Sequence, residues 1–396
     1  MNSLDIYVRD SRVARLDRSG NGEYTFSYLP DMRHGDVVSL TMPVNEDYSD
    51  PFMIIPPALQ VGFPEGALLE AIYRLAGKTL KIDDDFDVLA LVGQNMVGRV
   101  RILPRGQSLD TAAALSASQA VSELLRDPST TALLLEKLIE RLAIQIGLSG
   151  ILPKAFATAP LRGPLSFPAG DTIVKLETPE FPGIAIVEHL CLWAFRAAGI
   201  PTVDSELAAN GHALLVRRFD WGEGGQSLGF EDFCALSGLP RTAKYASSMA
   251  SVAQVLKMYC QDPALDTLFT MVVMNTLLRN GDAHLKNFGL VYDDPAYPRL
   301  APAYDVVSTV AWIRDDRPAL PLNQDAPHSW PTTEDLLAFG ETICRLSRQD
   351  MIVILNRCQE AIANTRPVLD TMRRRFPHAL ALERLDHTLS LAAASL

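Results

Sequence analysis

The stretch 280–287 holds four polar side chains that could do chemistry, namely Asp282, His284, Lys286 and Asn287. Asp282 and Asn287 are five positions apart, which is the interval between two residues of the protein-kinase catalytic loop. In that loop the Asp accepts the proton of the substrate hydroxyl, and the Asn binds a magnesium ion. The spacing therefore predicts a site for phosphoryl transfer. The interval alone is a weak signal, and the alternative is a polar loop between a helix and a strand in which the spacing arises by chance.

A second acidic residue follows in the order that a kinase uses. The runs 288–292 and 299–301 are short and strand-like, with a turn between them, and Tyr304 and Asp305 come soon afterwards. A strand, a turn, a strand and an Asp is how protein kinases present their second metal-binding Asp, which helps to neutralise the triphosphate. Asp305 is followed by Val306 rather than by Phe-Gly, so this is not an ordinary eukaryotic-type kinase sequence.

An upstream strand carries a candidate phosphate-binding lysine. Residues 171–176 predict a strand with one lysine, Lys175, inside it. Such a lysine often only extends its charge to solvent, but kinases keep their ATP-phosphate lysine on a strand at this place in the chain. The next helix, about 182–198, carries Glu188, which either pairs with Lys175 or lies at the surface. The strand 213–220 is then either the adenine-binding hinge or a plain core strand.

A buried helix is expected to present the catalytic loop, because the apolar residues of 265–276 keep a period of 3.6. Gly281 directly after Asn280 is typical of a turn at the end of a helix. From about Phe230 onward the chain is expected to be mainly helical. After Asp305 we expect a Pro-rich loop and then two or three helices.

The N-terminal residues 1–105 predict a β-rich module with a helix. Residues 4–8 alternate between apolar and polar, and a second strand-like run covers 24–29. The apolar runs 87–92 and 97–103 are expected to be strand-like or mixed.

Composition limits the possible classes of protein. The chain has 396 residues, of which 48% are hydrophobic and 21% charged, as expected for a globular protein of two or three domains. Its five cysteines are scattered and include no C-x-x-C pair, which favours a reducing compartment over a disulfide framework or a zinc site. Without a signal peptide or a membrane-spanning run we expect a cytoplasmic location. The net charge of −11 makes unaided nucleic-acid binding unfavourable.

One further loop, Gly147 to Lys154, has glycines on both sides of Ser149. Such a loop can approach phosphates through its backbone amides, and the alternative is a flexible surface turn.

Together these motifs resemble the HipA toxin family, the serine/threonine kinases of bacterial toxin–antitoxin modules, over nearly the whole chain. The most specific matches are Gly281–Asn287 and Ala301–Asp305. The other matching segments are Tyr7–Val8, Val38–Pro43, Phe63–Gly66, Phe86–Gly93, Ser149–Lys154, Val174–Leu176 and Arg217–Asp220.

The resemblance implies a role for each matching residue. Asp282 would be the catalytic base, Asn287 and Asp305 the magnesium ligands, Lys175 the ligand of the ATP phosphates, His284 and Tyr304 neighbours of the nucleotide, and the backbone around Arg217 and Phe219 the adenine hinge. Lys286 is counted with the catalytic residues because it lies inside the matching loop.

The resemblance also implies autophosphorylation of a serine in the Gly-rich loop, which expels the loop and inactivates the enzyme. Gly147 stands where some members carry that serine, so Ser149 is the candidate here. The hinge also differs from the usual pattern of the family. Arg217 stands where family members often have Glu, and Trp221 stands where they commonly have Arg.

The expected fold is α+β, a protein-kinase-like two-lobed fold with a β-rich N-terminal subdomain and an all-helical C-lobe. The expected domains are the N-terminal subdomain at 1–105, a linker and helix at 106–146, a kinase-like N-lobe with the hinge at 147–225 and the C-lobe with the catalytic loop at 226–396.

The expected function is an ATP- and magnesium-dependent serine/threonine protein kinase that acts as a toxin. It would phosphorylate a translation component such as an aminoacyl-tRNA synthetase, and also itself. The implied partners are a small helix-turn-helix antitoxin and, through it, operator DNA. Two alternatives are a catalytically silent corepressor that only binds the antitoxin, and a small-molecule phosphotransferase.

Overall fold

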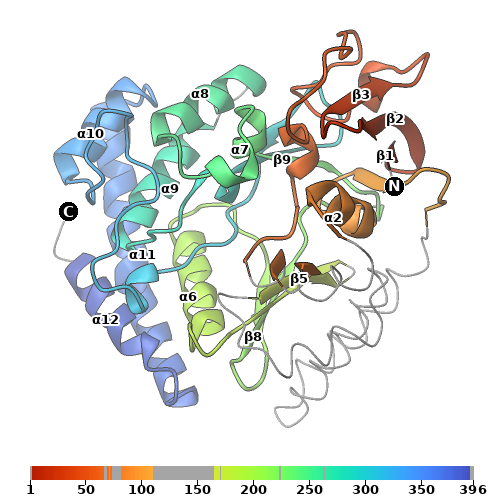
Figure 1. The fold of residues 1–396 in the computed structure, drawn as a ribbon. Helices are drawn as coiled ribbons and strands as arrows, with labels where there is room; N and C mark the ends of the chain where they lie inside the picture. Colours follow the sequence, from red (N-terminus) through yellow and green to blue (C-terminus); the bar gives the residue numbers. More distant parts are fainter. Residues whose placement is uncertain are drawn as a thin grey trace. The chain divides into compact units, whose positions relative to one another are not determined.

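The computed structural model describes residues 2–66, 69–70, 72–73, 82–109, 165–169, 171–222, 224–261 and 264–392. The chain forms two compact units (Figure 1). The first unit comprises Met1–Val174, Arg218–Arg241 and Val291–Pro298, and the second comprises Lys175–Arg217, Thr242–Leu290 and Arg299–Leu396. The predicted linker and helix at 106–146 lie, apart from 106–109, outside the described residues, as does Ser149 with its loop.

An antiparallel sheet opens the first unit, with the strand order β3-β2-β1-β4. Its strands are β1 (Ser3–Val8), β2 (Ser11–Arg18), β3 (Tyr24–Tyr28) and β4 (Val100–Pro104). Leu4, Ile6 and Val8 of β1 are buried, as the alternating pattern predicts for the face on a core, and Asp5 between them is buried as well. The strands expected near residues 4–8 and 24–29 are thus confirmed.

The apolar run at 87–92 is helical, in α2 (Asp85–Val92), rather than strand-like. Asp84 is the N-cap residue of this helix, because its carboxylate accepts hydrogen bonds from the backbone nitrogens of Phe86 (3.0 Å) and Asp87 (3.1 Å). These bonds satisfy two donors that a helix start leaves without partners. A short apolar run is ambiguous in period, and here the N-cap residue selects the helix.

Shorter elements complete the first unit. They are η1 (His34–Asp36), η2 (Pro57–Gln60), η3 (Gly93–Asn95), β5 (Leu165–Ala169), β9 (Gly229–Asp232) and α7 (Phe233–Leu236). The strand β9 departs from the helical pattern expected from Phe230 onward. Its Glu231 is buried and accepts hydrogen bonds from the hydroxyl groups of Ser39 and Tyr292.

The second unit is mainly helical and contains the predicted lysine strand. Its strands are the end of β6 (Thr172–Leu176), β7 (Ser205–Leu207), β8 (Ala213–Arg217), the start of β10 (Gly289–Tyr292), and β11 (Arg299–Leu300). Within this unit β7 pairs with β8 in antiparallel orientation, and β10 neighbours β11. The helices are α6 (Ile184–Ala197), α8 (Met249–Tyr259), α9 (Leu265–Leu277), α10 (Thr333–Thr342), α11 (Arg348–Arg375) and α12 (Ala381–Ala392), with the 3-10 turns η6 (Arg241–Ala243), η7 (Leu285–Asn287) and η8 (Thr309–Ala311).

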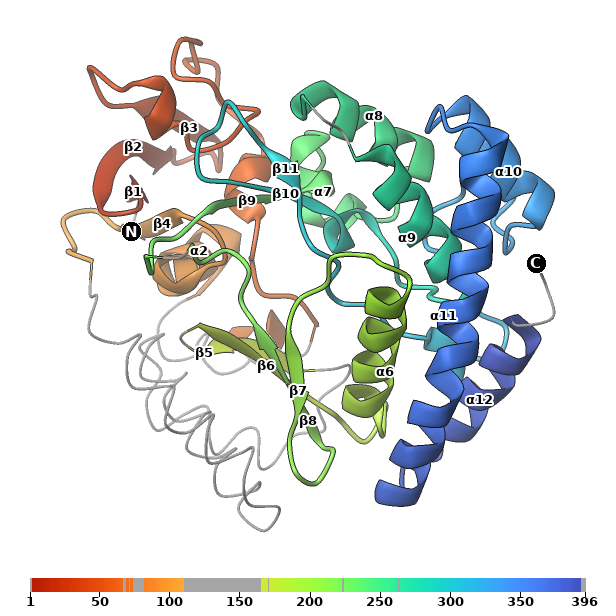
Figure 2. The same ribbon diagram turned by 180° about the vertical axis from the view of Figure 1, so that it is seen from behind.

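The long helix α11 organises the core of the second unit. It packs against α6, α9 and α12 (Figure 2). All residues of α9 from Leu268 to Leu277 are buried, which confirms the helix expected from the apolar pattern at 265–276. A helix buried on all sides is fixed by its neighbours, so the loop after α9 starts from a rigid support.

All five cysteines are buried free thiols. Within the described part of the chain, none of the helices combines the length and apolarity needed to cross a bilayer.

The packing of α10 can be tested at Gly340. A Cβ atom added there would lie 2.9 Å from Cε2 of Phe269 and closer still to Sδ of Met351. Overpacking a core typically costs about 1–3 kcal/mol, against a gain of about 1 kcal/mol from replacing Gly by Ala in a helix. We therefore expect Gly340→Ala to lower the free energy of unfolding by about 1 kcal/mol in a urea titration. Gly35→Ala, where nothing lies within 4 Å, is the control; equal stability of both variants would contradict this packing.

Candidate active site

The loop that carries Asp282 is fixed by hydrogen bonds from both sides. The buried Asn280 side chain donates from Nδ2 to Oδ1 of Asn275 (2.8 Å) and accepts from the backbone nitrogen of Asp282 (3.1 Å). The Gly281 nitrogen donates to Oγ1 of Thr309 (2.8 Å). Asp282 is therefore presented by a turn with restricted backbone freedom, as a preorganised catalytic group requires.

The Asp282 carboxylate has one oxygen held and one open. Its Oδ1 accepts a hydrogen bond from the Tyr245 hydroxyl (2.7 Å) and lies 3.9 Å from Nε2 of His284. Partial burial raises the pKa of Asp282 above its usual value, whereas His284 and the Tyr245 hydrogen bond act in the opposite direction. No described residue hydrogen-bonds to Oδ2 of Asp282, and the side chain is 45% exposed, so this oxygen can accept a proton from an incoming hydroxyl.

Lys175 at the end of β6 is shared by two carboxylates. Its Nζ donates to Oε1 of Glu188 on α6 (2.6 Å) and to Oδ1 of Asp305 (2.5 Å). The pair with Glu188 was one of two options left by the sequence, and it is present. The link from Lys175 to Asp305 joins residues that are 130 positions apart.

The two carboxylates that share Lys175 differ in how readily they ionise. Burial opposes the charge on Lys175, but Asp305 and Glu188 raise its pKa above the usual value. Burial raises the pKa of Glu188 to about 7, with Lys175 acting in the opposite direction. Burial would also raise the pKa of Asp305, but Lys175 outweighs it and lowers that pKa. Because one ammonium group cannot fully compensate two carboxylates, the negative charge is held mainly on Asp305.

Asn287 connects the catalytic loop to Asp305. Its Nδ2 donates to the backbone oxygen of Asp282 (2.8 Å) and to that of Asp305 (3.4 Å). Asp305 has a left-handed backbone with φ 55°, a conformation that Asp tolerates better than most residues. The Asn287 amide oxygen and the Asp305 carboxylate are oxygen ligands of the kind that Mg²⁺ takes together with phosphates. These two residues therefore fit a magnesium ion.

Two other predicted residues lie next to this group. The Tyr304 hydroxyl donates to the backbone oxygen of Lys286 (2.7 Å). His284 is buried, and its ring packs edge-to-face on Tyr245 with 5.1 Å between centroids. The second unit thus brings together seven predicted residues: Lys175, Asp282, His284, Lys286, Asn287, Tyr304 and Asp305.

The predicted hinge residues fall in different units. Arg217 ends β8, where its backbone nitrogen donates to the oxygen of Asp204 (2.8 Å). Phe219 belongs to the first unit, where its ring packs edge-to-face on Phe230 at 5.1 Å. Their adenine-binding role stays a prediction.

The most important residue that the sequence did not identify is Tyr245. It lies 37 positions before Asp282, and no motif connects the two. The backbone brings them together, because the nitrogen of Leu285 donates to the oxygen of Lys244 (3.1 Å). Thr309, which accepts from the Gly281 nitrogen, was missed for the same reason, whereas Asn275 lies only five positions before Asn280 and was missed because no motif marks it.

Comparison with known proteins identifies the family of the chain. Residues 146–366 match the HipA-like C-terminal domain, and residues 4–103 match the HipA N-terminal domain. The chain belongs to the HipA family. The resemblance inferred from the sequence motifs is thereby confirmed.

Individual HipA-family relatives match over different lengths. The Sinorhizobium fredii (strain NBRC 101917 / NGR234) protein named "Putative kinase Y4dM" is 26% identical over an alignment of 413 residues, covering 95% of this chain and 93% of that protein. "Putative kinase Y4mE" of the same strain is 30% identical over 248 residues, covering 58% of this chain and 59% of that protein.

A solved structure confirms the fold. HipA of Shewanella oneidensis MR-1, from its complex with HipB and operator DNA, has 17% sequence identity and a TM-score of 0.68. The match covers 99% of this chain and 100% of that one. The predicted kinase-like α+β fold is therefore confirmed.

Proposed function

We propose that this HipA-family protein is an ATP- and Mg²⁺-dependent serine/threonine protein kinase and the toxin of a toxin–antitoxin module. One observation carries the proposal: the Asn287 amide links the Asp282 loop to Asp305, whose carboxylate in turn binds Lys175. The residues that we propose as base, metal ligands and phosphate-binding cation are thus joined by direct hydrogen bonds. Phosphoryl transfer needs these groups, since its catalysis consists largely of positioning and charge stabilisation.

Each residue has a distinct proposed role. Asp282 accepts the proton of the substrate hydroxyl through Oδ2, while Tyr245 and His284 hold the side chain. Asn287 and Asp305 hold the magnesium ion, which when bound neutralises charge on the phosphates. Lys175 binds ATP phosphates and is itself kept in place and charged by Glu188 and Asp305.

The remaining assignments complete the nucleotide site. His284 and Tyr304 would lie beside the nucleotide, Lys286 would support the loop, and the backbone at Arg217 and Phe219 would bind adenine. Ser149 would be the autophosphorylated residue. Mass spectrometry of the protein after incubation with Mg-ATP tests this last assignment, which requires phosphate on Ser149.

A helix-turn-helix antitoxin is the proposed partner, with operator DNA bound through it. The S. oneidensis HipA was solved together with HipB and operator DNA, and the present chain shares its fold. A chain with a net charge of −11 needs such a partner to approach DNA. The proposed substrate is a protein of translation, such as an aminoacyl-tRNA synthetase.

Tyr245→Phe tests the proposed role of Tyr245 in holding the base. The hydroxyl of Tyr245 lowers the pKa of Asp282, so its loss should raise that pKa and leave less base ionised at a given acidic pH. We therefore expect the acid limb of the pH–rate profile to move to higher pH in Tyr245→Phe, because a hydrogen bond to a charged group favours the ionised form.

The control for this experiment is Tyr297→Phe, because Tyr297 is 65% exposed and belongs to the first unit. Profiles of kcat/KM against pH that coincide for wild type and Tyr245→Phe would refute the role of Tyr245.

A further inference from the structure

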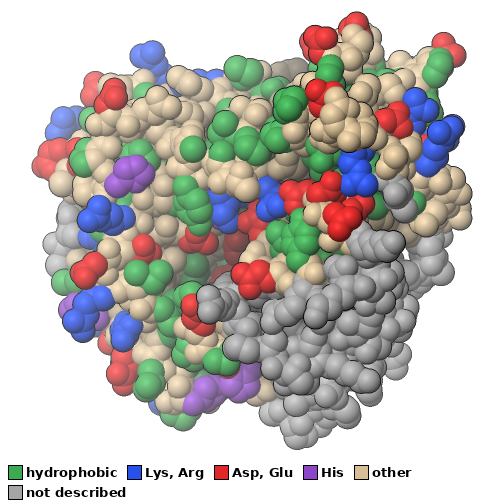
Figure 3. Space-filling view, viewed as in Figure 1, with side chains coloured by type: hydrophobic (Ala, Val, Ile, Leu, Met, Phe, Trp, Pro, Cys, Tyr) green, Lys and Arg blue, Asp and Glu red, His purple; other side chains and the backbone are tan. Residues whose placement is uncertain are grey.

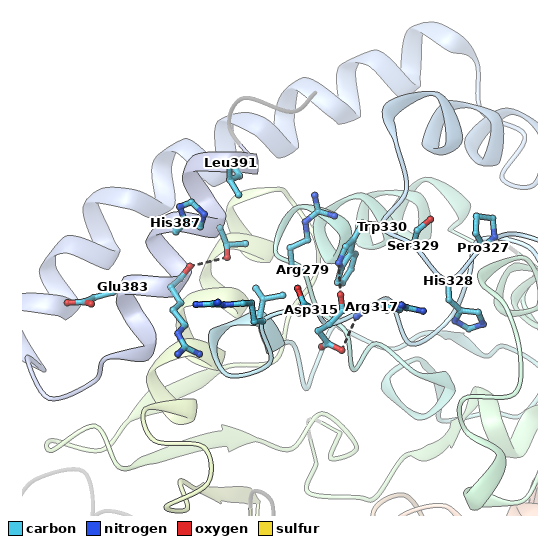
Figure 4. Close-up of a pocket in the computed structure, with 15 residues that line it drawn as sticks. Arg279, Asp315, Arg317, Pro327, His328, Ser329, Trp330, Glu383, His387 and Leu391 are labelled. Atoms are coloured by element: carbon cyan, nitrogen blue, oxygen red, sulfur yellow. Dashed lines mark hydrogen bonds between the residues drawn. The ribbon is translucent and has the colours of Figure 1, made fainter.

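A cavity lies in the second unit, beside the catalytic loop. Its volume is about 1050 Å³. Figure 4 shows residues from three parts of the chain around it: Arg279 after α9, the segment 310–330, and α12. None of the residues proposed above for catalysis or nucleotide binding lines this cavity.

The cavity is lined by four arginines, namely Arg279, Arg314, Arg317 and Arg384. Within the described part of the chain, no ion pair involves any of the four. Arg384 donates to the backbone oxygens of Ala311 (3.1 Å) and Trp312 (3.4 Å). In the space-filling view, basic and histidine side chains gather near α12, with acidic ones between them (Figure 3). Guanidinium groups without carboxylate partners favour carboxylate or phosphate ligands.

Arg279 carries an unsatisfied donor. Its guanidinium lies 5.0 Å from the ring centroid of Trp330, and the Trp330 indole nitrogen donates to the backbone oxygen of Asp316 (3.0 Å). Nη1 of Arg279 is buried and has no hydrogen-bond partner. The guanidinium is thus positioned at the cavity wall by its contact with the Trp330 ring.

One wall of the cavity is continuous with the catalytic loop. Arg279 has a left-handed backbone with φ 53° and is separated from Asp282 by only two residues. Gly281 packs on Asp316 and Arg317, where a Cβ atom would lie 2.8 Å from the Arg317 backbone oxygen. A ligand in the cavity would therefore lie beside the turn that presents the base.

We propose that this cavity binds an acidic segment of the protein that receives the phosphate, with carboxylates of the substrate on the arginines. The inference rests on the proposed kinase function and names a property of its substrate. Asp315, Asp316 and Glu383 also line the cavity. These acids would repel a continuous polyanion such as a nucleic acid, but separate carboxylates can each reach an arginine.

The test is a binding measurement that does not require catalysis. A fluorescein-labelled glutamate-rich peptide and its glutamine counterpart are titrated with the full-length Asp282→Asn protein, and fluorescence anisotropy is recorded. We expect the glutamate peptide to bind at least about tenfold more tightly than the glutamine peptide. Adding Arg314→Glu and Arg317→Glu should weaken binding of the glutamate peptide by about tenfold or more.

Arg348→Glu is the matched control, because Arg348 is exposed at the start of α11 in the same unit, and it should bind as the parent does. Equal binding of the two peptides, or unchanged binding by the double Arg variant, would overturn the proposal. Displacement by a single-stranded oligonucleotide at lower concentration than by unlabelled glutamate peptide would also overturn it. If the kinase function itself is wrong, wild type transfers no phosphate although the peptide still binds.

Discussion

Asp282→Asn should abolish measurable phosphoryl transfer while leaving nucleotide binding intact. The amide keeps the shape of the side chain and an oxygen that can accept the Tyr245 hydrogen bond, but it cannot take the proton of a hydroxyl. A positioned base contributes roughly 10²–10⁴-fold to a rate, and we expect a loss of about that size. The rate of phosphate incorporation and calorimetric titration with Mg-ATP measure the two effects separately.

The control is Asp325→Asn, since Asp325 is exposed in the loop before α10. It should match wild type in both measurements. An Asp282→Asn protein that transfers phosphate at the wild-type rate would show that another group is the base.

Asp305→Asn should remove magnesium-dependent nucleotide binding together with activity. The substitution takes away a charged metal ligand and one of the two carboxylates on Lys175, while the hydrogen bond from Lys175 to Glu188 (2.6 Å) can remain. We therefore expect a folded protein whose affinity for ATP no longer differs between Mg²⁺ and EDTA. If ATP binding by Asp305→Asn still depended on magnesium, residues other than Asp305 would hold the metal.

Asp305→Asn should also change the pH dependence of the thermal stability. The pKa of Asp305 is lowered in the folded protein, so ionised Asp305 stabilises the fold above the pKa of an unfolded Asp, about 3.9. This contribution is lost as the pH falls through the lower folded value. The Tm of wild type should exceed that of Asp305→Asn at neutral pH, and the difference should shrink in acid. A difference that is constant with pH would contradict the ion pair.

Elements with a long, regular pattern were predictable from sequence. The period over 265–276 predicted α9 because a helix buried by its neighbours shows its packing in its apolar residues. The lysine strand, the helix of Glu188 and the hairpin before Asp305 also followed from local patterns. The run 87–92 was misread because its length is ambiguous and the deciding hydrogen bonds come from the single side chain of Asp84.

The long-range hydrogen bonds of the site could not be predicted, although the motifs placed Lys175 and Asp305 in the same nucleotide site. The distance along the chain from Tyr245 to Asp282 is 37 residues, and from Lys175 to Asp305 it is 130 residues. Neither hydrogen bond leaves a periodic signal in the sequence. The arginine-lined cavity likewise combines Arg279, the segment 310–330 and α12, which only the packing of the second unit brings together.

The central claim, that this HipA-family protein transfers phosphate from ATP to a protein hydroxyl, has one direct test. Purified wild-type protein and Asp282→Asn are incubated with Mg-ATP, alone and with cell extract, and phosphorylated residues are mapped by mass spectrometry. We predict phosphate on a serine or threonine of the protein itself or of an extract protein with wild type, and none with Asp282→Asn. No phosphate on any protein, although ATP binds, would contradict the claim and leave a nucleotide-binding regulator.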